Sequence, residues 1–219
     1  MQRRRFVAQT GSLAISAALL SPGVSQAQAQ ANTPRAGTDF NALSRPAPVE
    51  APAGQIELVE FFWYNCPHCN AFEPVLAEWV KKLPTDIVFK RVPVAFRDDF
   101  VPQQRLYYAL EALNLLDSLH ARVFAAIHVE KKNLSQPPAI VDWVVKQGVD
   151  ASKFIEQFNS FSTTTKATRA RQLQTAYQVE GVPALGVAGR YYTDGALAKS
   201  MGRVLQVVEH LIDQIRRGS

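Results

Sequence analysis

The chain has only two cysteines, and they stand two residues apart as Cys66-Pro67-His68-Cys69. They directly follow the apolar run Ile56–Phe62 and open a segment with helical spacing of apolar residues. A strand that leads into a C-x-x-C at the start of a helix is typical of a redox site. Because there is no third cysteine, the pair can form a disulfide only within itself or with another molecule. The pattern therefore predicts a protein that passes a disulfide on, rather than one held together by disulfides.

Zinc binding and a structural disulfide are the two other common uses of such a pair. A structural zinc site takes about four ligands, and the remaining histidines, His120, His128 and His210, have no ligand-like spacing to the cysteines. A structural bridge across so short a loop removes little entropy from the unfolded chain. Redox exchange is the favoured interpretation, and it requires neither a metal nor a cofactor.

The N-terminus has the layout of a secretory signal peptide. The basic residues Arg3–Arg5 precede an apolar stretch around Leu13–Leu20, and small residues follow, with cleavage expected near Ala27 or Ala29. The apolar stretch is too short for a retained membrane anchor, which is the alternative. The stretch Arg3–Val7 also resembles a twin-arginine signal, so the general secretory and twin-arginine routes both stay open. Residues 1–29 are predicted to be removed.

The charge balance argues against a nucleic-acid partner. The net charge of the whole chain is +5, but residues 1–29 hold three arginines and no acidic residue. The mature chain would have 21 basic and 19 acidic residues, which is nearly neutral. A basic surface is the electrostatic signature of nucleic-acid binding. Export also explains the cysteine chemistry, because protein disulfides persist mainly outside the cytosol.

The first part of the predicted fold is a βαβ unit. Residues 30–54 are rich in proline and small residues, which predicts an extended or mobile lead-in with an edge strand near Leu43–Val49. Gln55–Trp63 is a nearly continuous apolar run, as expected of a strand buried on both faces. A helix should follow from Cys66 and end at Pro84. With Ile87–Val94 as the next strand, the two strands are expected to be parallel.

One proline conflicts with the second of these strands. Pro93 lacks the backbone N–H that a central strand needs, so it is expected at a strand end or a bulge.

The middle of the chain, residues 98–179, is predicted to be an inserted helical subdomain of roughly 80 residues. Pro102 opens its first helix, and Asp150 is a candidate N-cap for a later one. The remaining helices are expected at about residues 119–129, 138–147, 151–158 and 162–179.

The chain then returns to strands. Ala184–Val187 and Arg190–Thr193, joined by a turn at Ala188-Gly189, predict a hairpin. Ser200 is expected to cap a final amphipathic helix. Residues 55–97 and 180–219 would then form one α/β domain, with a four-stranded mixed sheet and helices on both faces.

Four motifs together resemble the DsbA family of periplasmic thiol:disulfide oxidoreductases: Val59-Glu60-Phe61-Phe62, Cys66-Pro67-His68-Cys69, Phe72-Glu73 and Gly181-Val182-Pro183-Ala184. The resemblance covers about residues 55–216. It implies a thioredoxin fold with an inserted all-helical subdomain, and an enzyme that donates its disulfide to newly exported proteins. It also implies reoxidation by a quinone-linked membrane partner of the DsbB type. The chain is expected to be a monomer.

The motif residues fit this chemistry. Cys66 would lie at a helix N-terminus, where the macrodipole and free N–H groups favour a thiolate. Cys69, one turn further in, would be the shielded resolving thiol. Pro67 suits the first helical turn, and the imidazole of His68 can stabilise the thiolate. A stabilised thiolate makes the reduced form favourable and the disulfide a strong oxidant.

Three further residues take expected roles from the resemblance. Pro183 resembles the family's cis-proline, and Val182 before it would offer its N–H and C=O to an extended substrate. Glu60 resembles a buried acid that relays a proton to or from the resolving cysteine, although an edge carboxylate reaching solvent is the alternative. Lys90 is a candidate partner for Glu60, but Lys90 and Arg91 point to opposite faces of the strand, so the pairing stays open.

The segment Trp63-Tyr64-Asn65 departs from the best-known member of the family, as does Asn70. Trp63 and Tyr64 are expected to pack or to line the substrate groove, which affects substrate preference rather than chemistry. Two other functions compete with disulfide donation. One is a reductant or isomerase of the same fold, although residues 30–54 are too short and proline-rich for the dimerisation domain of such isomerases. The other is a non-catalytic peptide-binding chaperone that uses the groove near Pro183.

Overall fold

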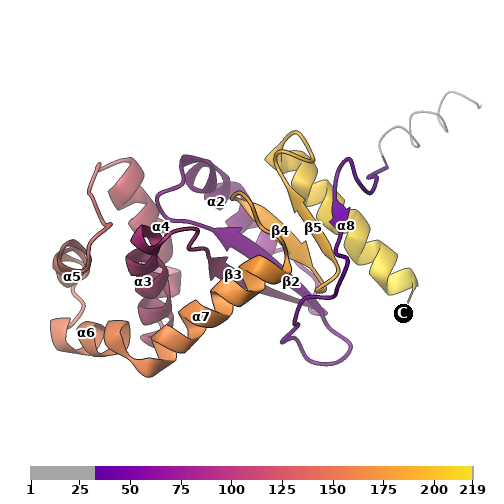
Figure 1. Ribbon diagram of the computed structural model, residues 1–219. Helices are drawn as coiled ribbons and strands as arrows, with labels where there is room; N and C mark the ends of the chain where they lie inside the picture. Colours follow the sequence, from indigo (N-terminus) through magenta and orange to yellow (C-terminus); the bar gives the residue numbers. More distant parts are fainter. Residues whose placement is uncertain (1–32, 219) are drawn as a thin grey trace, which may run out of the picture. The chain divides into compact units, whose positions relative to one another are not determined.

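The computed structural model describes residues 33–218, so the predicted signal peptide lies outside the described residues. Figure 1 shows helices packed around one twisted sheet. Within the described residues this sheet has five strands, in the order β1-β5-β4-β2-β3. The elements are, in chain order, β1 Asn41–Ala42, β2 Ile56–Phe62, α2 Pro67–Val80, β3 Ile87–Pro93, η1 Asp98–Phe100, α3 Val101–Ala112, α4 Leu116–His128, α5 Pro137–Lys146, α6 Ala151–Asn159, α7 Phe161–Ala176, β4 Ala184–Val187, β5 Tyr191–Asp194 and α8 Met201–Arg217.

Strand β2 is the central element of the sheet. It pairs in parallel with β3 and antiparallel with β4, and all seven of its residues are buried. The predicted βαβ unit and the predicted doubly buried strand are therefore confirmed. Pro93 is the last residue of β3, so it is at a strand end as expected and does not interrupt the ladder.

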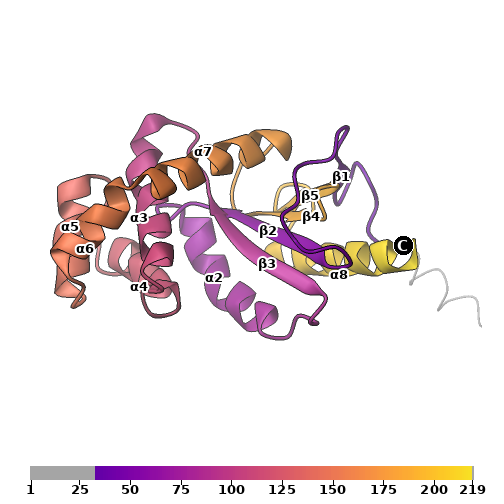
Figure 2. The same cartoon turned by 90° about the horizontal axis from the view of Figure 1, so that it is seen from below.

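Helices cover both faces of the sheet, as predicted (Figure 2). On one face, α2 and α8 pack against alternate residues of β2 and β4, including Leu58 and Leu185. On the other face, α7 and the adjacent helices pack against residues such as Phe61, whose ring lies 5.2 Å from that of Tyr177. Because side chains of a strand alternate between its two faces, β2 supplies both layers of the core.

The helices α3 to α7 occupy the stretch between β3 and β4 that the sequence predicts to be helical. Asp150 caps α6 as expected, since its carboxylate accepts a hydrogen bond from the backbone N–H of Lys153 at 2.8 Å. Ser200 caps α8 in the same way, through the N–H of Arg203. The apolar core of these helices is continuous with one face of the sheet. The boundaries of a separate helical subdomain stay a prediction.

The lead-in differs from the prediction. The edge strand β1 is Asn41–Ala42 rather than Leu43–Val49, and its pairing with β5 makes the sheet five-stranded instead of four-stranded. Beyond β1, Leu43 and Ala47 each donate one backbone hydrogen bond to the β4–β5 turn, but no ladder forms. Pro46 and Pro48 lack the N–H groups that a continuous strand would require.

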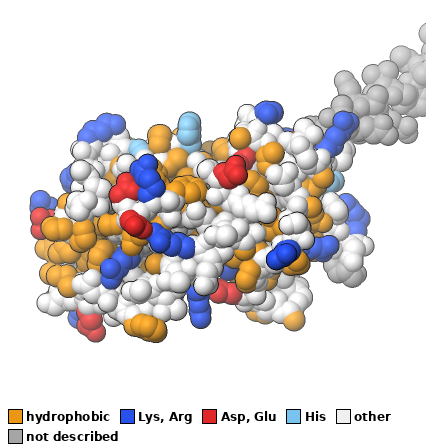
Figure 3. All heavy atoms as spheres, in the orientation of Figure 1, with side chains coloured by type: hydrophobic (Ala, Val, Ile, Leu, Met, Phe, Trp, Pro, Cys, Tyr) orange, Lys and Arg blue, Asp and Glu red, His pale blue; other side chains and the backbone are white. Residues whose placement is uncertain are grey.

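The face of the molecule drawn in Figure 3 is mixed in charge. In Figure 3, basic and acidic side chains are interspersed with apolar ones, so the visible face offers no continuous basic surface. Within residues 33–218, no helix has the length and apolar character needed to cross a bilayer.

Candidate redox site

Cys66 is the N-cap residue of α2, with extended backbone angles (φ −80°, ψ 119°). Pro67 follows in the first turn, where its missing N–H would have no helical partner in any case. The first turn contains no acidic residue, so nothing there offsets the positive end of the helix dipole. The β2–α2 connection thus brings the Cys66 sulfur to the position where a helix best stabilises an anion.

The surroundings of Cys66 lower the pKa of its thiol from 9.0 to about 6. The largest cause is a hydrogen bond from the thiol of Cys69, followed in the same direction by the backbone N–H groups of Cys69 and His68 and by the charge of the His68 imidazole. Burial opposes this shift. Cys66 is therefore largely a thiolate at neutral pH.

Cys69 has the opposite character. Its side chain is 1% exposed, and burial is the main cause that raises its thiol pKa far above the ordinary value. The thiol stays protonated and donates to Cys66. The two sulfurs are therefore unequal: Cys66 is an anionic, stabilised leaving group, and Cys69 is a protonated, shielded thiol.

Val182 and Pro183 lie beside Cys66, although they are more than a hundred residues away in the sequence. The Sγ of Cys66 lies 3.4 Å from the carbonyl oxygen of Val182, to which it donates when it is protonated, and the Val182–Pro183 peptide bond is cis, as the resemblance predicts. A groove of about 480 Å³ extends from this point. It is lined by His68, by residues 181–183, and by residues 194–196 and 199–201, which run from the end of β5 to the start of α8.

Glu60 is buried in β2 and is 1% exposed, so the alternative of an edge carboxylate reaching solvent is wrong. Its partner is Arg91, whose Nε lies 2.9 Å from Oε2 of Glu60. The proposed pairing with Lys90 is wrong as well. Lys90 lies on the opposite face of β3 and pairs with Glu57 at 3.1 Å. The register of the parallel strands decides this, because it places Glu60 opposite Arg91 and on the same face.

Burial raises the pKa of Glu60 to about 8, while Arg91 opposes this shift and the nearby Glu73 adds to it. Glu60 therefore holds a proton at neutral pH. Its charge, when present, also contributes to the raised pKa of Cys69. Glu60 thus combines a proton held at neutral pH with an electrostatic influence on Cys69, two properties of a proton donor to that thiol.

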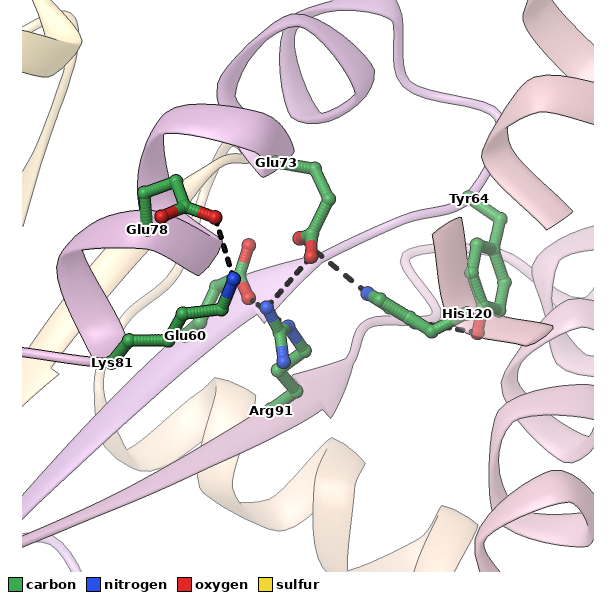
Figure 4. A network of polar contacts seen from close by, with 7 residues as sticks. All are labelled: Glu60, Tyr64, Glu73, Glu78, Lys81, Arg91 and His120. Carbon is green, nitrogen blue, oxygen red and sulfur yellow. Dashed lines mark hydrogen bonds and ion pairs between the residues drawn. The ribbon is translucent and has the colours of Figure 1, made fainter. Parts of the chain in front are cut away.

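Sequence reasoning missed the rest of the polar network around Glu60 (Figure 4). Arg91 Nη2 donates to Glu73 Oε1 at 2.7 Å, and Oε2 of Glu73 lies 3.5 Å from Nε2 of His120. Nδ1 of His120 is 2.8 Å from the hydroxyl of Tyr64. One signal was present in the sequence: Glu73 is four residues after Cys69, on the same face of a helix. His120 gave no such signal, since it comes from α4, far along the chain.

The residues before the cysteines pack, as predicted. The rings of Trp63 and Phe100 stack 3.7 Å apart, and Tyr64 is 1% exposed. His128 Nε2 lies 2.8 Å from the backbone oxygen of Tyr64, so α4 contacts this loop at two points. Over the described part of the chain, no group of three or more His, Cys, Asp or Glu side chains is placed to hold a metal ion.

A sheet of this topology, with an asymmetric dithiol at the N-terminus of the helix after β2 and a cis-proline beside it, defines a thioredoxin-fold thiol:disulfide oxidoreductase. Comparison with known proteins agrees. A family model described as a DSBA-like thioredoxin domain matches residues 85–203. The chain belongs to this DsbA-like thioredoxin family.

Three similar proteins cover most of the chain. The thiol:disulfide interchange protein DsbA of Burkholderia cepacia is 44% identical over 204 residues, which is 92% of this chain and 96% of that protein. DsbA of Bordetella pertussis is 41% identical over 218 residues, 99% of this chain and 100% of that protein. The crystal structure of Pseudomonas aeruginosa DsbA matches with a TM-score of 0.81 at 39% identity, over 84% of this chain and 96% of that one.

Proposed function

We propose that this protein donates the Cys66–Cys69 disulfide to newly exported proteins in the periplasm, through a mixed disulfide at Cys66. The observation that carries the proposal is the inequality of the two thiols. The pKa of Cys66 is lowered to about 6, whereas the pKa of Cys69 is raised. A pair in which one thiolate is strongly stabilised favours the reduced form, so its disulfide is a good oxidant.

The reaction begins with the oxidised pair. A substrate thiolate attacks Sγ of Cys66, a bond forms between these sulfurs, and the Cys66–Cys69 bond breaks. The electron pair goes to Cys69, which takes a proton from the carboxyl group of Glu60. A second substrate thiolate then attacks the substrate sulfur of the mixed disulfide, and Cys66 leaves as a thiolate. Two electrons pass from substrate to protein. Of the two protons that the substrate thiols lose, one replaces the proton given up by Glu60, and the other is released to solvent.

The groove beside Cys66 would hold the substrate chain. Val182 offers its backbone N–H and C=O to an extended segment, which is the strand-addition mode of peptide recognition. His68, which is exposed at the groove, tunes the Cys66 thiolate. Residues 55–97 and 180–219 supply these groups, and the helices of residues 98–179 pack behind them.

The reduced protein must be oxidised again before it can act on another substrate. A quinone-linked membrane partner of the DsbB type would serve as the oxidant. Residues 1–29 would direct export and be removed near Ala27 or Ala29. The mature protein would act as a monomer without a cofactor, because the cysteine pair itself carries the electrons.

The test is the equilibrium of the mature protein with reduced and oxidised glutathione. A disulfide far more oxidising than glutathione supports donation. A couple at or below the glutathione potential would instead support the reductant or isomerase.

Three variants test the two exchange steps and the remaining alternative, a peptide-binding chaperone. Cys69→Ser should accumulate a mixed disulfide when its Cys66 thiolate attacks a substrate disulfide, because no second thiol of the protein is left to attack that bond and release the substrate, and Cys66→Ser should form none. A double variant with both cysteines replaced by serine should have no activity in a refolding assay. If that double variant still prevents aggregation of unfolded protein as well as the wild type does, the groove serves a chaperone.

A further inference from the structure

His120 is a buried histidine that the mechanism above does not use. It is 6% exposed and lies among the rings of Phe62, Tyr64, Tyr107 and Phe124, with ring centres 5.2 to 5.9 Å from its own. Buried polar side chains are normally satisfied by hydrogen bonds. Among the described residues, the polar groups that contact its ring are the hydroxyl of Tyr64 and the carboxylate of Glu73.

These two neighbours fix the form of the imidazole. A hydroxyl donates readily to an unprotonated ring nitrogen, so Tyr64 at Nδ1 favours the neutral ring with its hydrogen on Nε2. Nε2 then faces Oε2 of Glu73 at 3.5 Å. Neither of these two atoms has another hydrogen-bond partner among the described residues. Burial also lowers the pKa of His120, which keeps the ring neutral.

The next link is a guanidinium shared between two carboxylates. Arg91 contacts Glu60 through Nε at 2.9 Å and Glu73 through Nη2 at 2.7 Å. If both carboxyl groups are ionised, one positive charge faces two negative charges in a buried site. Such an imbalance is costly in a low dielectric, so one proton is held within the cluster. Burial raises the pKa of Glu60 to about 8, so Glu60 can hold this proton.

We propose that His120 is a positioning residue that controls the protonation of Glu60 through Glu73 and Arg91. The Nε2–H of His120 stabilises part of the charge on Glu73, so Glu73 interacts less strongly with the guanidinium of Arg91 that it shares with Glu60. Arg91 is then more available to Glu60. Without this donor, Glu73 competes fully for Arg91, and the carboxylate form of Glu60 becomes less favourable.

The remaining titratable groups around His120 are consistent with this direction. From α2 it faces Glu73, from β3 Arg91 and from the β2–α2 loop Tyr64. From α3 it faces Tyr107, whose pKa is raised first of all by burial, so that ring is neutral. Glu73 is thus the only one of these groups that the His120 N–H can stabilise as an anion.

The inference rests on the role proposed above for Glu60, but its test does not need activity. The side-chain carboxyl of Glu60 is titrated by ¹³C NMR in the reduced full-length mature protein, with the resonance assigned by its loss in Glu60→Gln. His120→Phe, which removes both ring nitrogens, should raise the pKa of Glu60 by about half a unit. His120→Gln, which keeps an N–H donor, should restore most of the wild-type value.

Glu73→Gln should have the opposite effect. It removes the competing negative charge, so the pKa of Glu60 should fall by about one unit. A general loosening of the fold would shift the pKa of Glu60 in the same direction in both variants. His210→Gln on α8 is the matched control and should leave the pKa of Glu60 unchanged. Equal or same-sign shifts in His120→Phe and Glu73→Gln would overturn the proposal.

A wild-type measurement covers the case in which His120→Phe does not fold. The ¹⁵N resonance of His120 Nε2 should follow the ionisation of Glu60, with a midpoint near pH 8 that disappears in Glu60→Gln. A flat Nε2 resonance across this range would refute the coupling. If instead Glu60→Gln keeps full oxidase activity while the coupling is observed, the proton-donor role fails and the inference about His120 stands.

Discussion

The sulfur of Cys66 lies 3.4 Å from the carbonyl oxygen of Val182. A protonated thiol can donate a hydrogen bond to this oxygen, but a thiolate or a disulfide sulfur cannot. The carbonyl group is therefore released when Cys66 loses its proton or joins a substrate. At that moment it becomes available to accept a hydrogen bond from the backbone of the bound chain. The Cys66 sulfur and the Val182 carbonyl group are thus hydrogen-bonded to each other only while Cys66 is a neutral thiol.

The thiolate absorbance of reduced protein at 240 nm should titrate with a midpoint near pH 6. Because the Cys69 thiol is the first cause of the low pKa, Cys69→Ala should raise the midpoint by about one unit or more. Cys69→Ser retains an O–H donor and should shift it less. His68→Ala should raise the midpoint by less than Cys69→Ala does. An equal midpoint in the alanine and serine variants of Cys69 would show that the Cys69 hydrogen bond does not hold the pKa down.

The same shift makes the stability of the reduced protein depend on pH. The pKa of Cys66 is lower in the folded protein than its ordinary value of 9.0, so folding favours the thiolate. The resulting stabilisation is complete above about pH 9 and is lost as the pH falls through about 6. A three-unit difference corresponds to up to about 4 kcal/mol.

Urea unfolding of the reduced and the oxidised protein, between pH 5 and pH 9, tests this. The unfolding free energy of the reduced form minus that of the oxidised form should rise with pH across this range. The oxidised protein is the control, because its sulfurs do not titrate. A difference that is constant with pH would contradict the assignment.

Glu60 should act on stability in the opposite direction. Its pKa is raised from 4.5 to about 8, so the folded state keeps a proton that the unfolded state loses. The penalty is absent below about pH 4.5, grows as the pH rises and is complete above about pH 8. Glu60→Gln, which cannot ionise, should therefore gain stability relative to wild type across this window. Urea unfolding of both proteins in their oxidised forms measures this gain. A difference in unfolding free energy that does not change with pH would contradict the raised pKa of Glu60.

Glu60→Gln should also slow the first chemical step. Without the carboxyl proton, Cys69 has no buried acid to protonate it as it leaves Cys66. The rate of reduction of the oxidised protein by a dithiol peptide, measured by stopped-flow fluorescence, should fall by about 10-fold to 100-fold. Asp213→Asn, on the exposed side of α8, is the control and should react at the wild-type rate.

The sequence was sufficient for features that depend on local spacing. The cysteine pair, the strand before it and the capping residues Asp150 and Ser200 are all recognisable from neighbouring residues. The partner of Glu60 was not, because Lys90 and Arg91 are adjacent and only the register between β2 and β3 decides which of them shares its face. His120 joins the site from α4 through tertiary packing, which no spacing along the chain indicates.

The lead-in shows the same limit. Its proline content indicated an extended segment, but the position of β1 depends on which backbone groups β5 leaves unpaired. The burial of Glu60 also depends on tertiary packing. Glu60 is enclosed because α2 and α8 cover its face of the sheet, so an acid that looked compatible with a sheet edge is in the centre.

Gly186 in β4 provides a test of the packing behind the site. It is opposite Val59 in β2, one residue from Glu60. A Cβ atom at this position would lie 2.7 Å from Cζ of Tyr177 and would overlap the ring. The ring cannot withdraw easily, because Tyr177 is fully buried, packs on Phe61, and its hydroxyl accepts a hydrogen bond from the N–H of Gly189.

Gly186→Ala should therefore destabilise the protein by about 1–3 kcal/mol, the usual cost of overfilling a packed core. Gly202→Ala is the matched control, since a Cβ there meets no atom within 4 Å and alanine suits a helix better. It should leave stability unchanged or raise it by up to about 1 kcal/mol. Urea unfolding of both variants, in the same redox state, gives the comparison. If Gly186→Ala were as stable as Gly202→Ala, Tyr177 would have to move freely, and β4 would not be held in place by the ring packed against it.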